Sequence, residues 1–129
     1  MKTEAAEYLA KARECLDAAK KIIAVGLPRV AAKEGYLSAY HAAHAFVFEK
    51  TGQVVKTHSG MRAVFARIAK DDPRVDRWFN SFLAQAYTFK EVADYGVGSQ
   101  AVITVQEAQE LIDGAERFVD SLARLLLPE

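Results

Sequence analysis

The chain has 129 residues, of which 51% are hydrophobic and 26% are charged. This composition supports one domain with a single core and excludes an intrinsically disordered chain. Because 17 Lys and Arg residues balance 17 Asp and Glu residues, attraction to nucleic acid through bulk charge is also excluded, whereas a local basic patch is not.

The cysteine content and the length of the apolar stretches indicate where in the cell the protein is expected. Cys15 is the single cysteine, so no intramolecular disulfide forms, and acids stand near the start where a signal peptide needs apolar residues. No stretch approaches the roughly 18 apolar residues of a membrane span. We therefore expect one domain over residues 1–129, cytoplasmic and without membrane contact.

Two long helices are predicted in the first half of the chain. Residues 3–25 place apolar side chains every three or four positions, with Thr3 as the expected N-cap and Gly26 as the stop. Pro28 suits the first turn of a second helix, which ends near Gly52. This second helix is apolar on most sides, so we expect it to be central and most buried.

A short third helix and a long fourth helix follow. Thr57 or Ser59 can cap the third helix. Asp72 followed by Pro73 predicts the start of the fourth, with the acid as cap and the proline in the first turn.

The last helix has the clearest start signal. Residues 94–103 lack a helical period, and Thr104 with Glu107 forms a capping box. The elements together predict an all-α protein, an antiparallel up-and-down four-helix bundle with one additional short helix. No strand is predicted, which excludes the nucleotide-binding folds built on parallel sheets.

His41 and His44 are three residues apart on the second helix, so both side chains can reach one point. They could serve as a general base or metal ligands, or they could pack in the core. A metal would need a further ligand from Glu49, His58 or Asp94, and the Glu-x-x-His pattern of bundle metal sites is absent. We therefore expect no metal and no cofactor.

Residues 56–60 lie where a loop becomes a helix. Exposed amides, the hydroxyls of Thr57 and Ser59, and the Lys56 cation would suit a phosphate there, beside His58. The alternative is simple helix capping by either hydroxyl.

Residues 93–96 end the fourth helix. Lys90 and Asp94 are spaced to form an ion pair, and Tyr95 follows them. These residues could bind a ligand, or they could form an ordinary helix stop with the tyrosine packed over the end.

Arg62 and Arg67 are interpreted as solvent-exposed charges without a function.

Three segments in order make the chain resemble the HEPN domain family of small helical bacterial and archaeal proteins. They are the run rich in aromatic residues and alanine at residues 35–46 and the segments 56–60 and 93–96. The resemblance implies a helical bundle, usually a homodimer, often encoded beside a minimal nucleotidyltransferase in a toxin–antitoxin-like pair.

Many members of that family are metal-independent ribonucleases that use an Arg followed four to six residues later by His. None of the three histidines here has an Arg at that spacing, so the motif is absent. His44 and Lys90 also stand where related sequences often carry Arg. Both differences weaken guanidinium–phosphate chemistry, because Lys offers a point charge and His can be neutral.

Three hypotheses follow. In the first, the protein is a dimeric HEPN module that binds a nucleotide, RNA or a partner nucleotidyltransferase through His41, His44, His58, Lys90 and Asp94, with the neighbouring polar residues of the two segments. In the second, it is a ribonuclease toxin using His41 or His58 as acid or base, with a lysine at position 56 or 90 contacting the phosphate. In the third, it is a purely structural dimerisation domain.

Overall fold

The computed structural model describes residues 1–127 and is helical throughout that range apart from its connections. Its elements in chain order are α1 (Thr3–Ala24), α2 (Pro28–Thr51), α3 (His58–Lys70), α4 (Arg77–Tyr95), the 3₁₀ turn η1 (Gly98–Ala101) and α5 (Val105–Leu126).

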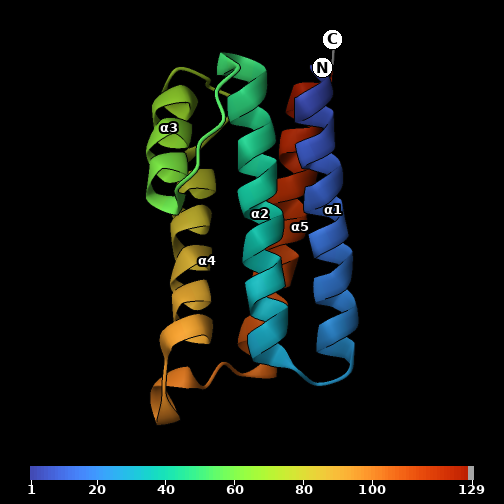
Figure 1. Cartoon of the computed structure of the whole chain (residues 1–129), viewed down its shortest axis with the longest axis vertical. Coiled ribbons are helices and arrows are strands. Elements are labelled where there is room, and N and C mark those ends of the chain that lie inside the picture. Colours follow the sequence, from blue (N-terminus) through green and yellow to red (C-terminus); the bar gives the residue numbers. More distant parts are fainter. Residues whose placement is uncertain (128–129) are drawn as a thin grey trace.

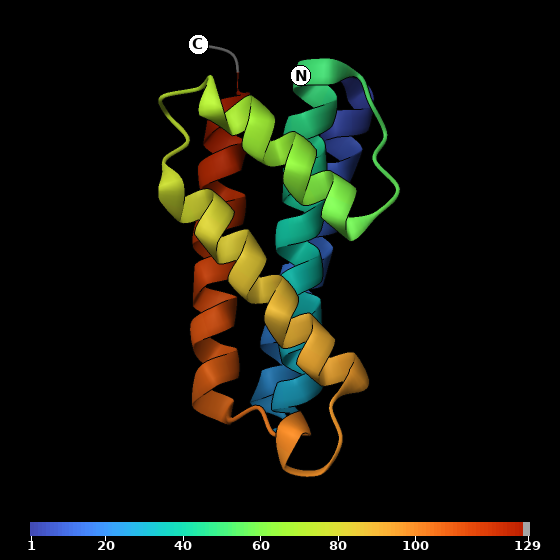
Figure 2. The same ribbon diagram turned by 90° about the vertical axis from the view of Figure 1, so that its left-hand side faces the viewer.

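The four long helices run alternately down and up, with α2 between α1 and α4 and with α5 behind it (Figure 1). The shorter α3 lies beside α4, which crosses in front of α5 obliquely (Figure 2). This arrangement confirms the predicted up-and-down bundle with one additional short helix.

Local signals explain most helix ends. Pro28 occupies the first turn of α2, and Gly52 ends it in the left-handed region with φ of 72°. Thr104 and Glu107 form the predicted capping box of α5, each accepting from the other's backbone N–H at 3.0 Å.

Helix α1 begins at Thr3, as predicted, but the predicted N-caps of α1 and α4 are wrong. The N-cap of α1 is Lys2, whose side chain makes no capping bond and whose backbone N–H donates to Glu49 at 2.7 Å. Helix α4 begins four residues later than predicted, with Asp76 accepting from the Trp78 N–H as the cap. The carboxylate of Asp72 instead accepts hydrogen bonds from the backbone and side chain of Arg74, in the turn that precedes α4.

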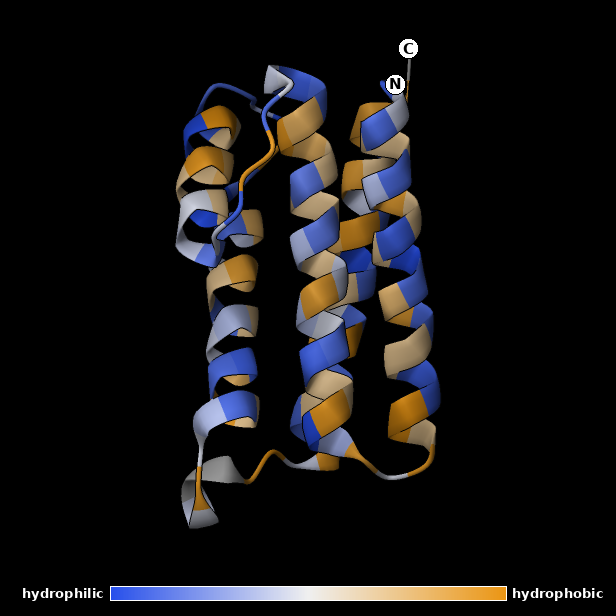
Figure 3. Ribbon diagram, in the orientation of Figure 1, coloured by the Kyte–Doolittle hydropathy of each residue, from blue (hydrophilic) through white to orange (hydrophobic). Residues whose placement is uncertain are grey.

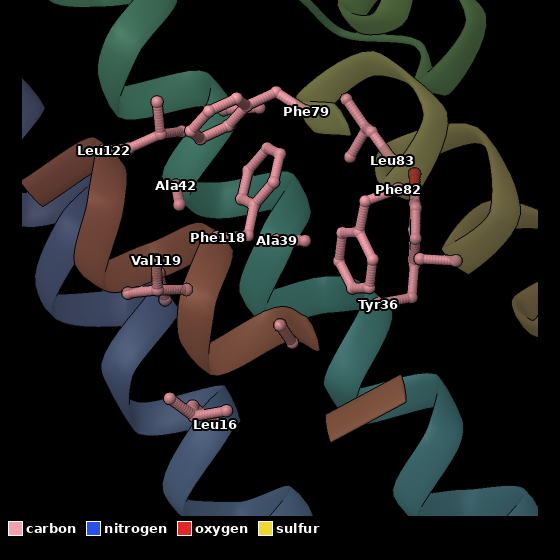
Figure 4. Close-up of a cluster of buried hydrophobic side chains, with 14 of the residues drawn as sticks. Leu16, Tyr36, Ala39, Ala42, Phe79, Phe82, Leu83, Phe118, Val119 and Leu122 are labelled. Atoms are coloured by element: carbon pink, nitrogen blue, oxygen red, sulfur yellow. The ribbon is translucent and has the colours of Figure 1, made fainter. Parts of the chain in front are cut away.

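Apolar and polar bands alternate along the long helices (Figure 3), and the apolar faces meet in one core. Phe118 of α5 lies at its centre, next to the small side chains Ala39 and Ala42 of α2 and the phenylalanines Phe79 and Phe82 of α4 (Figure 4). Alanines along α2 let its neighbours approach closely on several sides, so α2 is the central, most buried helix, as predicted.

Candidate functional site

His58 is the first residue of α3, and this position turns its ring toward α2. The preceding Thr57 caps the helix by accepting from the Gly60 N–H at 2.9 Å. Nδ1 of His58 lies 2.6 Å from the Tyr36 hydroxyl, and its ring meets the Tyr40 ring edge-on at 4.7 Å between centroids. Within residues 1–127, Nε2 of His58 has no protein partner and remains open to solvent.

Two cations lie on the other side of His58. Arg62 is four residues further along α3, and its guanidinium stacks over Tyr87 of α4 at 4.2 Å. The ring of Tyr87 lies 5.6 Å from that of His58, and the Lys90 amine lies 5.8 Å from the same tyrosine. We call Tyr36, Tyr40, His58, Arg62, Tyr87 and Lys90 the His58 cluster.

Arg62 is the residue that sequence reasoning missed. Its interpretation as a solvent-exposed charge is wrong, because the side chain is partly buried and its buried Nε has no hydrogen-bond partner within residues 1–127. The available signal was the four-residue spacing from His58, which places both side chains on one face of a helix. The order is the reverse of the ribonuclease motif, with the histidine first.

Lys90 is held by an ion-pair triad. Its amine and that of Lys33 each lie 3.0 Å from a different carboxylate oxygen of Asp94. The pair between Lys90 and Asp94 is the predicted one, whereas the second cation comes from α2. The two amines lower the pKa of Asp94, and its carboxylate raises the pKa of Lys90. Glu91 adds a second carboxylate 3.8 Å from the Lys90 amine, so the two amines and the two carboxylates balance in charge.

All three histidines surround Tyr40. Its ring centroid lies 5.5 Å from that of His41 and 6.1 Å from that of His44, in addition to its contact with His58. Burial lowers the pKa of each histidine, and for His41, with Lys11 and the other histidines adding repulsion, the value falls to about 4. The rings are therefore neutral near pH 7 and able to accept a proton.

His44 and His41 lie toward α1. His44 is only 6% exposed, stacks on Tyr8 at 4.0 Å, and accepts the backbone N–H of Val55 at its Nε2. His41 is partly exposed, but its Nδ1 is buried and has no hydrogen-bond partner among the residues that the structure describes. His44 thus holds the connection between α2 and α3 in place through its hydrogen bond to Val55, whereas Nδ1 of His41 makes no such bond among the described residues.

The remaining predicted residues lie around the His58 cluster. Lys56 and Ser59 are exposed at the start of α3, on either side of Thr57. Tyr95 is 72% exposed and does not pack over the end of α4; the Lys90 amine lies 5.6 Å from its ring. Lys90, one turn before the second segment, connects that segment to the His58 cluster through Tyr87.

No group of three or more potential metal ligands gathers anywhere in the described part of the chain. Across residues 1–127, none of the helices combines the length and apolar character needed to cross a membrane.

Comparison with known proteins agrees with this fold. The model of the HEPN domain matches residues 5–125, and the chain belongs to that family. It is similar to a "putative toxin" of Methanocaldococcus jannaschii, with 28% identity over 89% of this chain and 83% of that protein. It is also similar to a UPF0332 protein of Thermotoga maritima, with 26% identity over 90% of this chain and 86% of that protein.

Proposed function

We propose that this HEPN protein is a cytoplasmic homodimeric module of a toxin–antitoxin-like two-component system, and that it binds RNA at the His58 cluster. The similarity to a protein described as a putative toxin supports the toxin–antitoxin setting. A minimal nucleotidyltransferase is the proposed second component, as the family resemblance implies.

The observation that carries RNA binding is the stacking of Arg62 on Tyr87 next to the open face of His58. Single-stranded RNA is recognised by cations that contact phosphates and by aromatic or guanidinium planes that stack on bases. Arg62 and Lys90 supply the cations, and the partly exposed rings of Tyr40 and Tyr87 supply the planes. Lys56 and Ser59, exposed at the start of α3, extend this surface toward a neighbouring phosphate.

The test is fluorescence anisotropy with a fluorescein-labelled single-stranded RNA of about 12 nucleotides, in EDTA. Arg62→Gln should weaken binding about tenfold, equivalent to about 1.4 kcal/mol, because a charge and a stacking plane are lost. Arg67→Gln is the matched control: it makes the same change on an exposed position of the same helix and should stay within about twofold. Equal losses in both variants would contradict a localised site, and AMP as competitor separates nucleotide from RNA binding.

A ribonuclease activity is the second candidate, favoured by the hydrogen bond between Tyr36 and His58. Burial raises the pKa of Tyr36, so it stays protonated. A hydroxyl can donate to Nδ1 in one histidine tautomer and accept from it in the other. Nε2 can therefore remove a proton from a ribose 2′-hydroxyl, with Arg62 and Lys90 stabilising charge on the phosphate.

RNA cleavage in EDTA, read on a gel, tests this activity. His58→Ala should abolish cleavage that persists in chelator, and His41→Ala tests the alternative base next to Tyr40. Binding without cleavage in the unaltered protein would reject the ribonuclease. If neither variant changes binding or cleavage while both lower the melting temperature, the His58 cluster has a purely structural role, and both functions are wrong.

A further inference from the structure

A groove of about 410 Å³ lies between α4 and α5, away from the His58 cluster. Its floor is aromatic, with Trp78, Phe82 and Phe89 from α4. Tyr87 lies about half a helical turn around α4 from Phe89, because successive residues are about 100° apart. The groove and the His58 cluster therefore open on different sides of the same helix. An apolar floor with a polar rim is typical of a protein interface.

The α5 rim of this groove changes sign along its length. Glu107, Glu110 and Asp113 line its N-terminal part, and Arg117 lines its C-terminal end. Arg124 lies two turns further along α5, at an adjacent pocket that Arg117 also lines. All five are exposed. The α5 acids that face α1 have cationic partners within the chain: Glu116 pairs with Lys20, and Asp120 pairs with Arg13.

The rim acids lack cationic partners of their own. In the part of the chain that the structure describes, Glu110 and Asp113 accept hydrogen bonds only from the glutamine amides four residues earlier, and neither forms an ion pair. The guanidinium of Arg117 lies 4.0 Å above Trp78 without a carboxylate partner among the described residues. The groove thus presents unpaired charge of both signs over an aromatic floor.

We propose that this face is the homodimer interface and that its occupant is a second copy bound antiparallel across a two-fold axis. The inference rests on the homodimer in the proposed function and adds where the two copies meet. A two-fold axis near the middle of α5 reverses the second helix. It brings Asp113 opposite Arg117 of the second copy and Glu107 opposite Arg124, and the same pairs recur on the other side.

Charge complementarity selects this occupant. RNA would be repelled by the acidic half of the rim, and a uniformly basic partner would be repelled by the arginine half. A reversed second copy satisfies both halves at once and covers Trp78 and Phe89. The His58 cluster stays open in each copy, because it faces the other side of α4.

The experiment uses charge reversal in three variants, with mass measured by size-exclusion chromatography and light scattering. Glu107→Lys with Asp113→Lys reverses the two acids that face arginines of the second copy, and Arg117→Glu with Arg124→Glu reverses those arginines. Each should raise the dimer dissociation constant at least tenfold, because like charges then face each other. All four substitutions in one chain swap the sign of both members of each pair, so opposite charges face each other again and the dimer should be restored. Circular dichroism checks that every variant is folded.

The control is Glu4→Lys with Glu7→Lys, an equal charge change on exposed positions of α1, which should leave the dimer intact. A dimer that survives both half-reversals, or a fourfold variant that stays monomeric while folded, would place the interface elsewhere. Anisotropy on the same samples reads RNA binding independently. A monomeric unaltered protein that binds RNA would overturn the interface and the homodimer but not the RNA site.

Discussion

Replacing Gly114 with alanine should destabilise the protein although alanine is the better helix former. Gly114 is in the middle of α5, where it lies under the Phe82 ring of α4. A Cβ at this position would lie 2.4 Å from Cε1 of Phe82 and 3.1 Å from its Cζ. The ring stacks on Trp78 at 5.1 Å and packs against Phe118 at 5.8 Å, so any shift away from the new Cβ disturbs both contacts.

Two opposing terms set the size of the effect. Forcing an extra carbon into a packed core costs about 1–3 kcal/mol, while exchanging Gly for Ala in a helix gains about 1 kcal/mol. The clash should prevail, so Gly114→Ala should lower the free energy of unfolding by up to about 2 kcal/mol. The melting temperature should fall by up to roughly 10 °C for a domain of this size.

A double-mutant cycle isolates the contact between these two residues. Phe82→Leu removes Cε1 and Cζ, so in that background Gly114→Ala should be neutral or should stabilise by up to about 1 kcal/mol. Urea unfolding followed by circular dichroism measures all four proteins. An equal effect of Gly114→Ala in both backgrounds, or a higher melting temperature in the single variant, would refute the steric explanation.

Two further predictions concern charge. The pKa of His41 is about 4 in the folded protein and about 6.5 in an unfolded chain, so the unfolded state binds more protons between these values and stability falls as the pH drops from 6.5 to 4. Because water screens this half-buried ring, we expect the free energy of unfolding to fall by about 1–2 kcal/mol over that pH range. His41→Gln should remove this pH dependence, as measured by urea unfolding at pH 6.5 and pH 4. Asp94→Asn removes one negative charge, which frees Lys33 and leaves Lys90 paired with Glu91. It should raise RNA affinity two- to fivefold by anisotropy, about 0.4–1 kcal/mol; unchanged affinity would separate this triad from the RNA site.

Helix order and most helix ends were predictable because local signals decide them. Gly52 and the capping box at Thr104 satisfy backbone groups with residues that are neighbours in sequence, so they act the same way in any bundle. The start of α4 was not predictable. Asp72 and Asp76 are both good caps, and the choice depends on Val75, which is buried in the core and holds the preceding turn in place.

The candidate site was only half predictable for a related reason. The segments containing His58 and Lys90 carry recognisable patterns, but the burial of His44 and the stacking of Arg62 depend on which helices become neighbours. His44 stands where related sequences often carry an arginine, and here it is sealed between Tyr8 and the α2–α3 connection. No periodicity in α2 alone distinguishes that environment from an open site, because α2 is apolar on most sides.

The position of Arg62 changes how the missing motif is interpreted. A histidine followed four residues later by an arginine places an imidazole and a guanidinium on one face of a helix. In α3 this reversed order brings Arg62 and His58 to the same tyrosine, Tyr87. If that geometry suffices for RNA binding, Arg62→Lys should recover only part of the affinity lost in Arg62→Gln, because an ammonium restores the charge but not the stacking plane. Full recovery would mean that charge alone matters at this position.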